Sequence, residues 1–254
     1  MKEKGISGST LKIIAMLFML MDHTAAVVLG SILIKNGIFE VDNISAAYIG
    51  GLIEEGITGW VYLFYQIMRR FFGRLAFPIY CFLLVEGFEK THNRAGYVRR
   101  MFVFALISEI PFDLAFSFRV VDFSYQNVFF TLCLGFLMMW VMETVEKHCH
   151  IQAIRFLGYG VSVLGAVFAA ERMGSDYGAK GIIAIALLFL FRKNKWEQIA
   201  AGCVAFVWEV TAPLAFLLVG LYNGRRGLLL KYVFYIFYPV HLLVLYHIAI
   251  IIYF

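Results

Sequence analysis

Long apolar runs separated by short charged segments make up most of this chain. A helix needs about 20 predominantly apolar residues to cross the hydrocarbon core of a bilayer, and shorter or broken runs are typical of buried or re-entrant pieces. Seven runs predict helices on this basis: residues 11–34, 75–88, 97–118, 128–145, 154–170, 181–191 and 232–254. The pattern predicts an all-α polytopic membrane protein, a bundle of about 7–9 transmembrane helices with re-entrant or interfacial elements.

Two further runs are ambiguous because charges, glycine or proline interrupt them. Residues 49–72 contain a Glu-Glu pair near one end and an Arg-Arg pair near the other, which favours an interfacial or re-entrant element over a lipid-facing span. Residues 199–222 contain Glu209 and Pro213, which predict either one kinked span or two half-length helices.

Composition supports the membrane assignment. Hydrophobic residues make up 62% of the 254 residues and charged residues only 15%, whereas soluble domains have about 45–50% and about 25%. The first run lacks a signal-peptidase-like cleavage site, so we expect it to be the first span. No internal repeat is visible, which lowers the expectation of a secondary transporter. We expect one transmembrane domain over residues 1–254. The basic residues form short clusters and no continuous stripe, so we expect no nucleic-acid partner.

The basic clusters predict how the chain is oriented. Lys and Arg gather on the cytoplasmic side of membrane proteins. We place the N-terminus inside and assume that residues 49–72 do not cross the membrane and that residues 199–222 form a hairpin. Four other basic segments then fall on the same side as the N-terminus: residues 90–100, 147–155, 192–195 and 225–231. The loops on the opposite side then carry five acids, Glu40, Asp42, Asp122, Glu171 and Asp176. Four basic residues also fall on that side and are exceptions to the rule: Lys35, Arg119, Arg172 and Lys180. The N-terminal cluster itself consists of Lys2, Lys4 and Lys12.

Asp22 and His23 lie well inside the first apolar run. A carboxylate at the centre of a bilayer costs about 2.5–3.5 kcal/mol by insertion scales and more by others, so intramembrane ionisable residues are functional candidates. Neighbouring residues point about 100° apart on a helix, so each side chain is expected to find its partner on another helix. Histidine has an unperturbed pKa of about 6.5, so it can serve as a general base at neutral pH.

Other polar residues in apolar runs extend this candidate site. Glu109 and Asp113 are four residues apart and share one face if the helix continues through Pro111; alternatively, Pro111 ends the helix and both acids reach the interface. Arg74 either pairs with one of the three intramembrane acids or extends to the headgroups. Of the two histidines in the last run, which lie about 120° apart, His241 is the better candidate because it follows a proline.

No metal site is predicted. Three of the four cysteines lie in apolar runs without close partners, as buried structural cysteines do. The fourth lies between two histidines at positions 148 and 150, a weak ligand pattern without a second cluster.

Several polar motifs resemble the TraX family of integral membrane proteins. The opening segment (residues 11–16 and 21–23), Gly73-Arg74-Leu75-Ala76-Phe77-Pro78 and Ser108-Glu109-Ile110-Pro111-Phe112-Asp113 are the most specific. Further matching segments follow along most of the chain: 84–88, 91–94, 97–100, 127–132, 176–178 and 235–242.

The resemblance implies an acetyltransferase located in the bacterial inner membrane. The family's namesake acetylates the amino terminus of pilin subunits with acetyl-CoA, and transmembrane acyltransferases with similar motifs use an early intramembrane histidine. By this similarity His23 is the general base or acyl relay, supported by Asp22, Arg74, Glu109, Asp113 and His241. Acetyl-CoA would be bound by Arg94, Arg99, Arg100, Asn127, Tyr177 and Tyr238, and the neighbouring basic residues Lys90, Arg225 and Arg226 extend its docking surface.

The acceptor and the mechanism stay open at this point. An insertion at residues 38–72 departs from the family pattern, so the acceptor could be a peptide amine, a small amine or a glycan hydroxyl. Direct transfer and a covalent relay are both compatible with the residues, as are a monomer and a homo-oligomer. The alternative is a proton- or cation-coupled transporter that uses Asp22, His23, Glu109 and Asp113.

Overall fold

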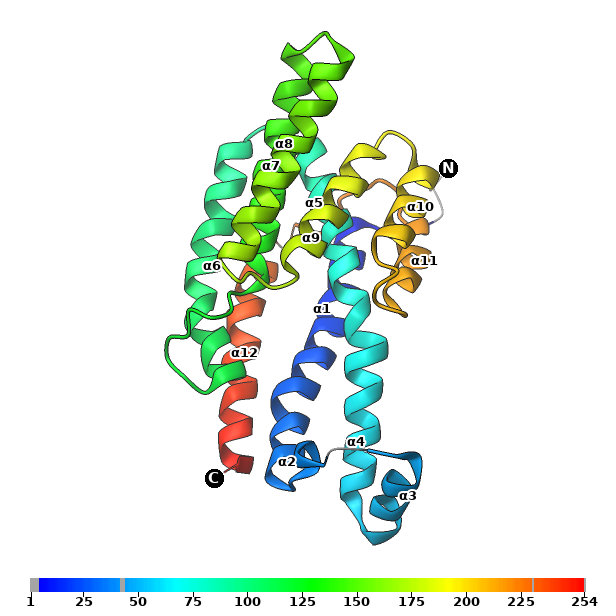
Figure 1. The fold of residues 1–254 in the computed structure, drawn as a ribbon, viewed down its shortest axis with the longest axis vertical. Coiled ribbons are helices and arrows are strands. Elements are labelled where there is room, and N and C mark those ends of the chain that lie inside the picture. Colours follow the sequence, from blue (N-terminus) through cyan, green and yellow to red (C-terminus); the bar gives the residue numbers. More distant parts are fainter. Residues whose placement is uncertain (1–4, 42–43, 230, 254) are drawn as a thin grey trace.

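The protein is a bundle of helices elongated along one axis in the computed structural model (Figure 1). The structure describes residues 5–41, 44–229 and 231–253, so the predicted loop acid Asp42 and the basic residues Lys2 and Lys4 lie outside the described residues. The described part contains helices and no strand, apart from two isolated β-bridges. The prediction of an all-α polytopic membrane protein is confirmed.

The first apolar run forms one continuous helical element from Gly8 to Lys35. It consists of α1 (Gly8–His23), a π-helical stretch η1 (Thr24–Leu29) and α2 (Gly30–Lys35). The Ser7 hydroxyl caps its start by accepting from the Thr10 amide at 3.2 Å, and Gly37, with φ of 69°, lets the chain turn away after its end.

The second long helix corrects the interpretation of residues 49–72. Only α3 (Ala46–Glu55) is a separate short helix, and it has no fully buried residue. After Gly56 the chain continues as α4 (Ile57–Ile67), η3 (Met68–Phe72), η4 (Gly73–Leu75) and α5 (Ala76–Lys90), a 34-residue element long and apolar enough to cross a membrane. Arg69 is accommodated in this apolar element because it forms an ion pair inside the bundle.

Proline does not end the next helix. α6 (Arg94–Ser117) runs through Pro111 and ends where Phe118 adopts a left-handed conformation. Glu109 and Asp113 therefore stay on one helix, and the alternative in which Pro111 ends it is wrong. A hairpin of α7 (Val128–His148) and α8 (Gln152–Arg172) follows.

The last third of the chain contains short helices and one long one. α9 (Gly178–Leu190) leads to α10 (Lys195–Ala205), η5 (Ala212–Leu214) and α11 (Ala215–Gly220), and α12 (Lys231–Tyr253) ends the bundle. The Lys195 ammonium donates to the carbonyls of Gly220 and Tyr222 at 2.7 and 3.0 Å, so both ends of residues 199–222 lie together. This segment is the hairpin of two short helices.

Among the described residues, five helices are long and apolar enough to cross a membrane: Gly8–Lys35, Ile57–Lys90, Val128–His148, Gln152–Arg172 and Tyr232–Tyr253. Only 6% of the most apolar 18-residue stretch of Gln152–Arg172 is buried inside the bundle, as expected for a lipid-facing helix. The protein is therefore a multi-pass membrane protein, with α6 and the shorter helices packed among these five.

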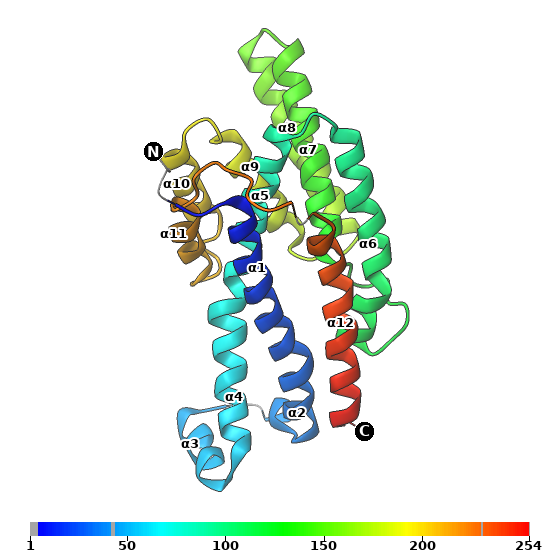
Figure 2. The ribbon, with the colours of Figure 1, turned by 180° about the vertical axis from the view of Figure 1, so that it is seen from behind.

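The basic segments gather at one end of the bundle (Figures 1 and 2). The Gly8 amide donates to the Arg225 carbonyl at 2.8 Å, and Lys90 donates to the Gly224 carbonyl at 2.7 Å. Arg192 joins Glu89 and Glu146 at 2.9 Å each. We call this end the basic end; its location in the cytoplasm stays a prediction.

Candidate functional site

Two histidines from opposite ends of the sequence meet in the middle of the bundle. Nδ1 of His23 on α1 lies 2.7 Å from Nε2 of His241 on α12, and the rings are stacked with their centroids 5.0 Å apart. Nδ1 of His241 lies 2.7 Å from the Phe237 carbonyl, which accepts hydrogen bonds only. With both rings neutral, His241 donates to Phe237, His23 donates to His241, and Nε2 of His23 keeps its lone pair.

The surroundings of this histidine pair are aromatic. Phe116 and Tyr238 lie edge-on to His23, at centroid distances of 5.4 and 6.0 Å. Phe237 stacks on His241 at 4.6 Å. The π-helical stretch η1 begins at Thr24, directly after His23. Such stretches are frequent at functional sites, because they redirect the side chains next to them.

Asp22 turns toward another helix, as the helical geometry predicts. Its Oδ2 accepts from Nη1 of Arg69 at 2.8 Å, while Oδ1 is buried without a partner. The sequence suggested Arg74 as a partner for Asp22, Glu109 or Asp113, but Arg74 pairs with Glu209 at 3.4 Å. Because the sequence favours a separate element over residues 49–72, it does not indicate Arg69 as the partner of Asp22.

A glycine makes room for the Asp22 carboxylate. A Cβ added at Gly73 would overlap the Asp22 carboxylate. We expect Gly73→Ala to displace Asp22 from Arg69 and to lower the free energy of unfolding by about 1–3 kcal/mol, the cost of overpacking. Chemical unfolding of the purified variant measures this effect. Gly51→Ala is the matched control, since its Cβ would meet nothing within 4 Å; equal stability of the two variants would contradict the expected overlap.

The acids of α6 hold the start of α7 and the loop before it. Glu109 accepts from the Asn127 side chain, which also donates to the Ala105 carbonyl at 2.9 Å. The oxygen of the same Asn127 side chain caps α7 by accepting from the Phe129 amide. Oδ2 of Asp113 accepts from the Asp122 amide at 2.8 Å. The two acids and Asn127 therefore hold residues 118–127 against α6.

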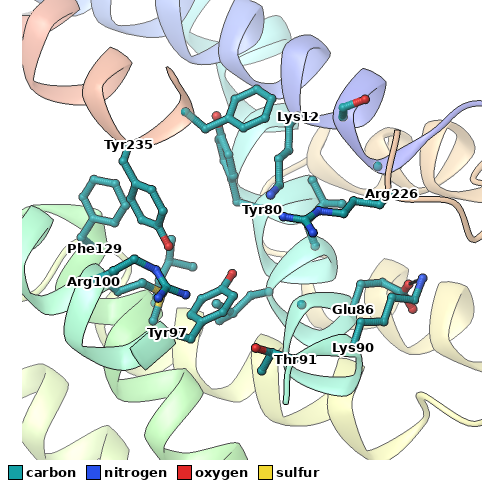
Figure 3. Close-up of a pocket in the computed structure, with 18 of the residues that line it drawn as sticks. Lys12, Tyr80, Glu86, Lys90, Thr91, Tyr97, Arg100, Phe129, Arg226 and Tyr235 are labelled. Atoms are coloured by element: carbon teal, nitrogen blue, oxygen red, sulfur yellow. Dashed lines mark ion pairs between the residues drawn. The ribbon is translucent and has the colours of Figure 1, made fainter. Parts of the chain in front are cut away.

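A cavity of about 310 Å³ lies between α1, α5, α6, α7 and α12 (Figure 3). Its wall includes four cationic side chains and one carboxylate, from Lys12, Lys90, Arg100, Arg226 and Glu86. Figure 3 shows Lys12 and Arg226 pointing into the space opposite Arg100 and Tyr97. Glu86 lies 2.6 Å from Lys90, which leaves three cations without a carboxylate among the lining residues.

Tyr238 lies between this cavity and the histidine pair. It lines the cavity and is only 3% exposed. Its ring centroid lies 6.0 Å from that of His23 and 5.7 Å from that of His241. Neither histidine is among the cavity-lining residues, so the Tyr238 side chain separates the cavity from the pair.

Only some of the residues expected to bind acetyl-CoA lie at the cavity. Arg100 and Tyr238 line the cavity. Arg94 pairs with Glu143 outside it, Arg99 is exposed, and Tyr177 stacks on Phe77 with centroids 3.6 Å apart. Asn127, already described, caps α7. Lys12 was interpreted only as an orientation signal, although its position inside the first apolar run could have indicated a role in the cavity.

Fold and site together define a multi-pass helical membrane protein with a histidine pair inside the bundle beside a cation-lined cavity. The chain belongs to the TraX family, whose model, described as "TraX protein", matches residues 7–249. It is 31% identical over 202 residues to "Probable fimbrial assembly protein FimC, serogroup H1" of Dichelobacter nodosus, covering 69% of this chain and 80% of that protein. No solved structure matches the chain.

Proposed function

We propose that this protein is an acetyltransferase that moves an acetyl group from acetyl-CoA to an amine or hydroxyl acceptor inside the membrane. The observation that carries the proposal is the cation-lined cavity, which begins at the basic end and is closed by Tyr238 beside the His23–His241 pair. Membership of the TraX family agrees with this activity.

The cavity has the chemistry that coenzyme A requires. Lys12, Arg100 and Arg226 suit its phosphate groups, because guanidinium and ammonium groups form charge-assisted hydrogen bonds with phosphate. Tyr80, Leu83, Met101 and Leu132 supply apolar wall for the pantetheine arm. A thioester at the inner end of the cavity would lie against Tyr238.

The histidine pair has the arrangement that a proton acceptor needs. The Phe237 carbonyl fixes the tautomer of His241, which in turn fixes that of His23 and leaves Nε2 of His23 free. That nitrogen can remove the proton from an attacking amine or hydroxyl, with His241 stabilising the resulting imidazolium. The same lone pair can also attack the thioester carbon, which forms an acetyl-histidine, breaks the C–S bond and releases coenzyme A as its thiolate. The acceptor then attacks the acetyl carbon and releases His23 in its original form. Arg74, paired with Glu209 outside the cavity, has no role at the thioester in this proposal.

The acceptor we propose is the amino terminus of a fimbrial subunit. The relative from Dichelobacter nodosus is named a probable fimbrial assembly protein. Because acetyl-CoA is made in the cytoplasm, the basic end faces the cytoplasm of a bacterial cell in this proposal, and the protein lies in the inner membrane. A small amine or a glycan hydroxyl would use the same chemistry.

The transporter alternative gains no support from the hydrogen bonds. Asp22 bonds to Arg69, His23 to His241, and Glu109 to Asn127. The carboxylate of Asp113 bonds to a backbone amide. No hydrogen bond in the described part of the chain joins two of the four groups, as a proton relay would require.

Neutralising cavity cations tests the donor site. We expect Arg226→Ala and Arg100→Ala each to raise the Kd for acetyl-CoA about 10–150-fold, since hydrogen bonds to charged groups contribute about 1.5–3 kcal/mol. Isothermal titration of the purified protein measures this affinity. Arg99→Ala is the matched control, because Arg99 is exposed outside the cavity. If Arg99→Ala weakens binding as much as Arg226→Ala does, the donor does not occupy the cavity.

A further inference from the structure

Acetyl transfer needs a group that the histidine pair does not supply. Attack on a thioester moves electrons onto its carbonyl oxygen, and a hydrogen-bond donor placed at that oxygen is a large part of catalysis in acyl transfer. In the proposed reaction Nε2 of His23 acts on the acceptor, and Arg74 pairs with Glu209 outside the cavity. The donor therefore has to come from the inner end of the cavity.

Met19 and Tyr238 mark this inner end. Met19 lines the cavity and precedes His23 by four residues, which is about 6 Å along α1. Tyr238 lines it too and precedes His241 by three residues, about 4.5 Å along α12. Lys12 lies further out, eleven residues or about 16 Å before His23. With the phosphates of coenzyme A at the cations, the thioester comes to lie near Tyr238.

Tyr238 is also the polar side chain of the wall that contacts the histidines. Its ring lies edge-on to both His23 and His241. Among the described residues that line the cavity, no other ring contacts either histidine. The rings of Tyr97 and Tyr235, which also line the cavity, stack on phenylalanines instead, at centroid distances of 4.7 and 4.8 Å. Tyr238 is therefore the best placed donor for a thioester beside the pair.

The start of α7 orients the Tyr238 hydroxyl. The amide of Val128, the first residue of this helix, donates a hydrogen bond to that hydroxyl. Amides in the first turn carry the partial positive charge of a helix N-terminus, so this bond makes the hydroxyl a stronger donor. A tyrosine hydroxyl that accepts one hydrogen bond still has its proton to donate. Val128 also lines the cavity, so the proton is available to a group bound there.

Asn127 and Glu109 fix the position of this helix start. The Asn127 side-chain oxygen accepts from the Phe129 amide at 3.0 Å, and its nitrogen donates to Glu109 and to the Ala105 carbonyl. Both residues belong to motifs that the sequence singles out, but neither lines the cavity. Their role in this arrangement is to position the amide that orients Tyr238.

We propose that the Tyr238 hydroxyl donates a hydrogen bond to the carbonyl oxygen of the bound thioester and stabilises the negative charge that develops there. This role rests on the proposed function. As His23 removes a proton from the acceptor, the acceptor bonds to the acetyl carbon, and the electron pair of the C=O bond moves onto the oxygen. When the C=O bond forms again, the C–S bond breaks and the thiolate takes the proton from His23. Tyr238 keeps its own proton throughout.

Tyr238→Phe tests this role, because it keeps the ring and removes only the hydroxyl. We expect kcat to fall about 10²–10³-fold, the usual effect of removing one oxyanion donor. The Kd for acetyl-CoA should change much less, because the hydrogen bond strengthens as charge develops in the transition state. Tyr80→Phe is the matched control and should keep the wild-type kcat. Tyr80 lines the same cavity from α5, and in the described part of the chain its ring contacts neither histidine.

A second measurement does not depend on turnover. A coenzyme A analogue in which a methylene replaces the thioester sulfur carries an unreactive ketone, which can be isotope-labelled at its carbonyl carbon. In infrared difference spectra we expect its carbonyl stretch at a lower frequency in the wild-type and Tyr80→Phe proteins than in Tyr238→Phe, because a hydrogen bond weakens the C=O bond.

The results separate this role from the proposed function. Equal carbonyl frequencies in the wild-type and Tyr238→Phe proteins, or equal kcat values, would overturn the role of Tyr238 and leave the donor site standing. A loss of kcat in Tyr80→Phe as large as that in Tyr238→Phe would also overturn it. Failure of the ketone to bind the wild-type protein would overturn the donor site itself, and the role of Tyr238 with it.

Discussion

Removing either histidine of the pair is expected to lower kcat for acetyl transfer by about 10²–10⁴-fold, the usual contribution of a positioned general base. His23→Ala removes the nitrogen that accepts the proton. His241→Ala removes the ring that fixes the tautomer of His23 through the 2.7 Å hydrogen bond. The affinity for acetyl-CoA should stay unchanged, because neither ring lines the cavity.

The double variant sharpens this expectation. If the two rings act as one unit, His23→Ala combined with His241→Ala should lose about as much activity as either single variant. Steady-state kinetics of the four proteins provide the measurement. His247→Ala is the matched control, since His247 bonds only to the Leu243 carbonyl of its own helix among the described residues. Losses that multiply in the double variant would contradict a coupled pair.

Breaking the Asp22–Arg69 ion pair is expected to have the largest effect on stability. Each partner is mostly buried, with side-chain exposures of 14% and 27%. Removing one charge leaves the other buried and unpaired, at a cost of about 3–5 kcal/mol. Asp22→Asn and Arg69→Gln should each lower the melting temperature of the detergent-purified protein by about 10 °C, given about 2–4 °C per kcal/mol for a chain of this size.

The double exchange distinguishes the ion pair from a loss of packing. Asp22→Asn combined with Arg69→Gln removes both charges and should recover most of the lost stability, as other neutralised buried pairs do. Lys193→Ala is the control at an exposed ion pair, where the Lys193 side chain is 77% exposed, and it should change stability by less than about 1 kcal/mol. A double variant less stable than both single variants would show that the ion pair is not the cause.

Much of the fold could be predicted because the bilayer imposes simple length and polarity rules. Apolar runs of sufficient length became helices, and the basic segments came together at one end. The error at residues 49–72 arose because the Arg-Arg pair looked too polar for a span. The decisive compensation, a carboxylate on α1 packed against Gly73, exists only in the folded bundle.

The candidate site could be predicted in part. Helical geometry correctly separated Asp22 from His23. The preceding proline favoured His241 over His247, and it is His241 that bonds to His23, whereas His247 bonds to the Leu243 carbonyl of its own helix. The division of the basic residues between the cavity and structural ion pairs could not be predicted. Arg94 and Arg100 are alike in sequence, but among the described residues only Arg94 forms an ion pair with a carboxylate on α7, whereas Arg100 lines the cavity.

The most direct test of the central claim is acetyl-CoA consumption by the purified protein. The protein is incubated with acetyl-CoA labelled in its acetyl group and a peptide with a free amino terminus, and both coenzyme A release and labelled peptide are measured. We expect the wild-type protein to produce both, His23→Ala to produce neither, and Arg226→Ala to require more acetyl-CoA. The account would be contradicted by a wild-type protein that neither binds nor consumes acetyl-CoA. It would also be contradicted by a His23→Ala variant as active as the wild type.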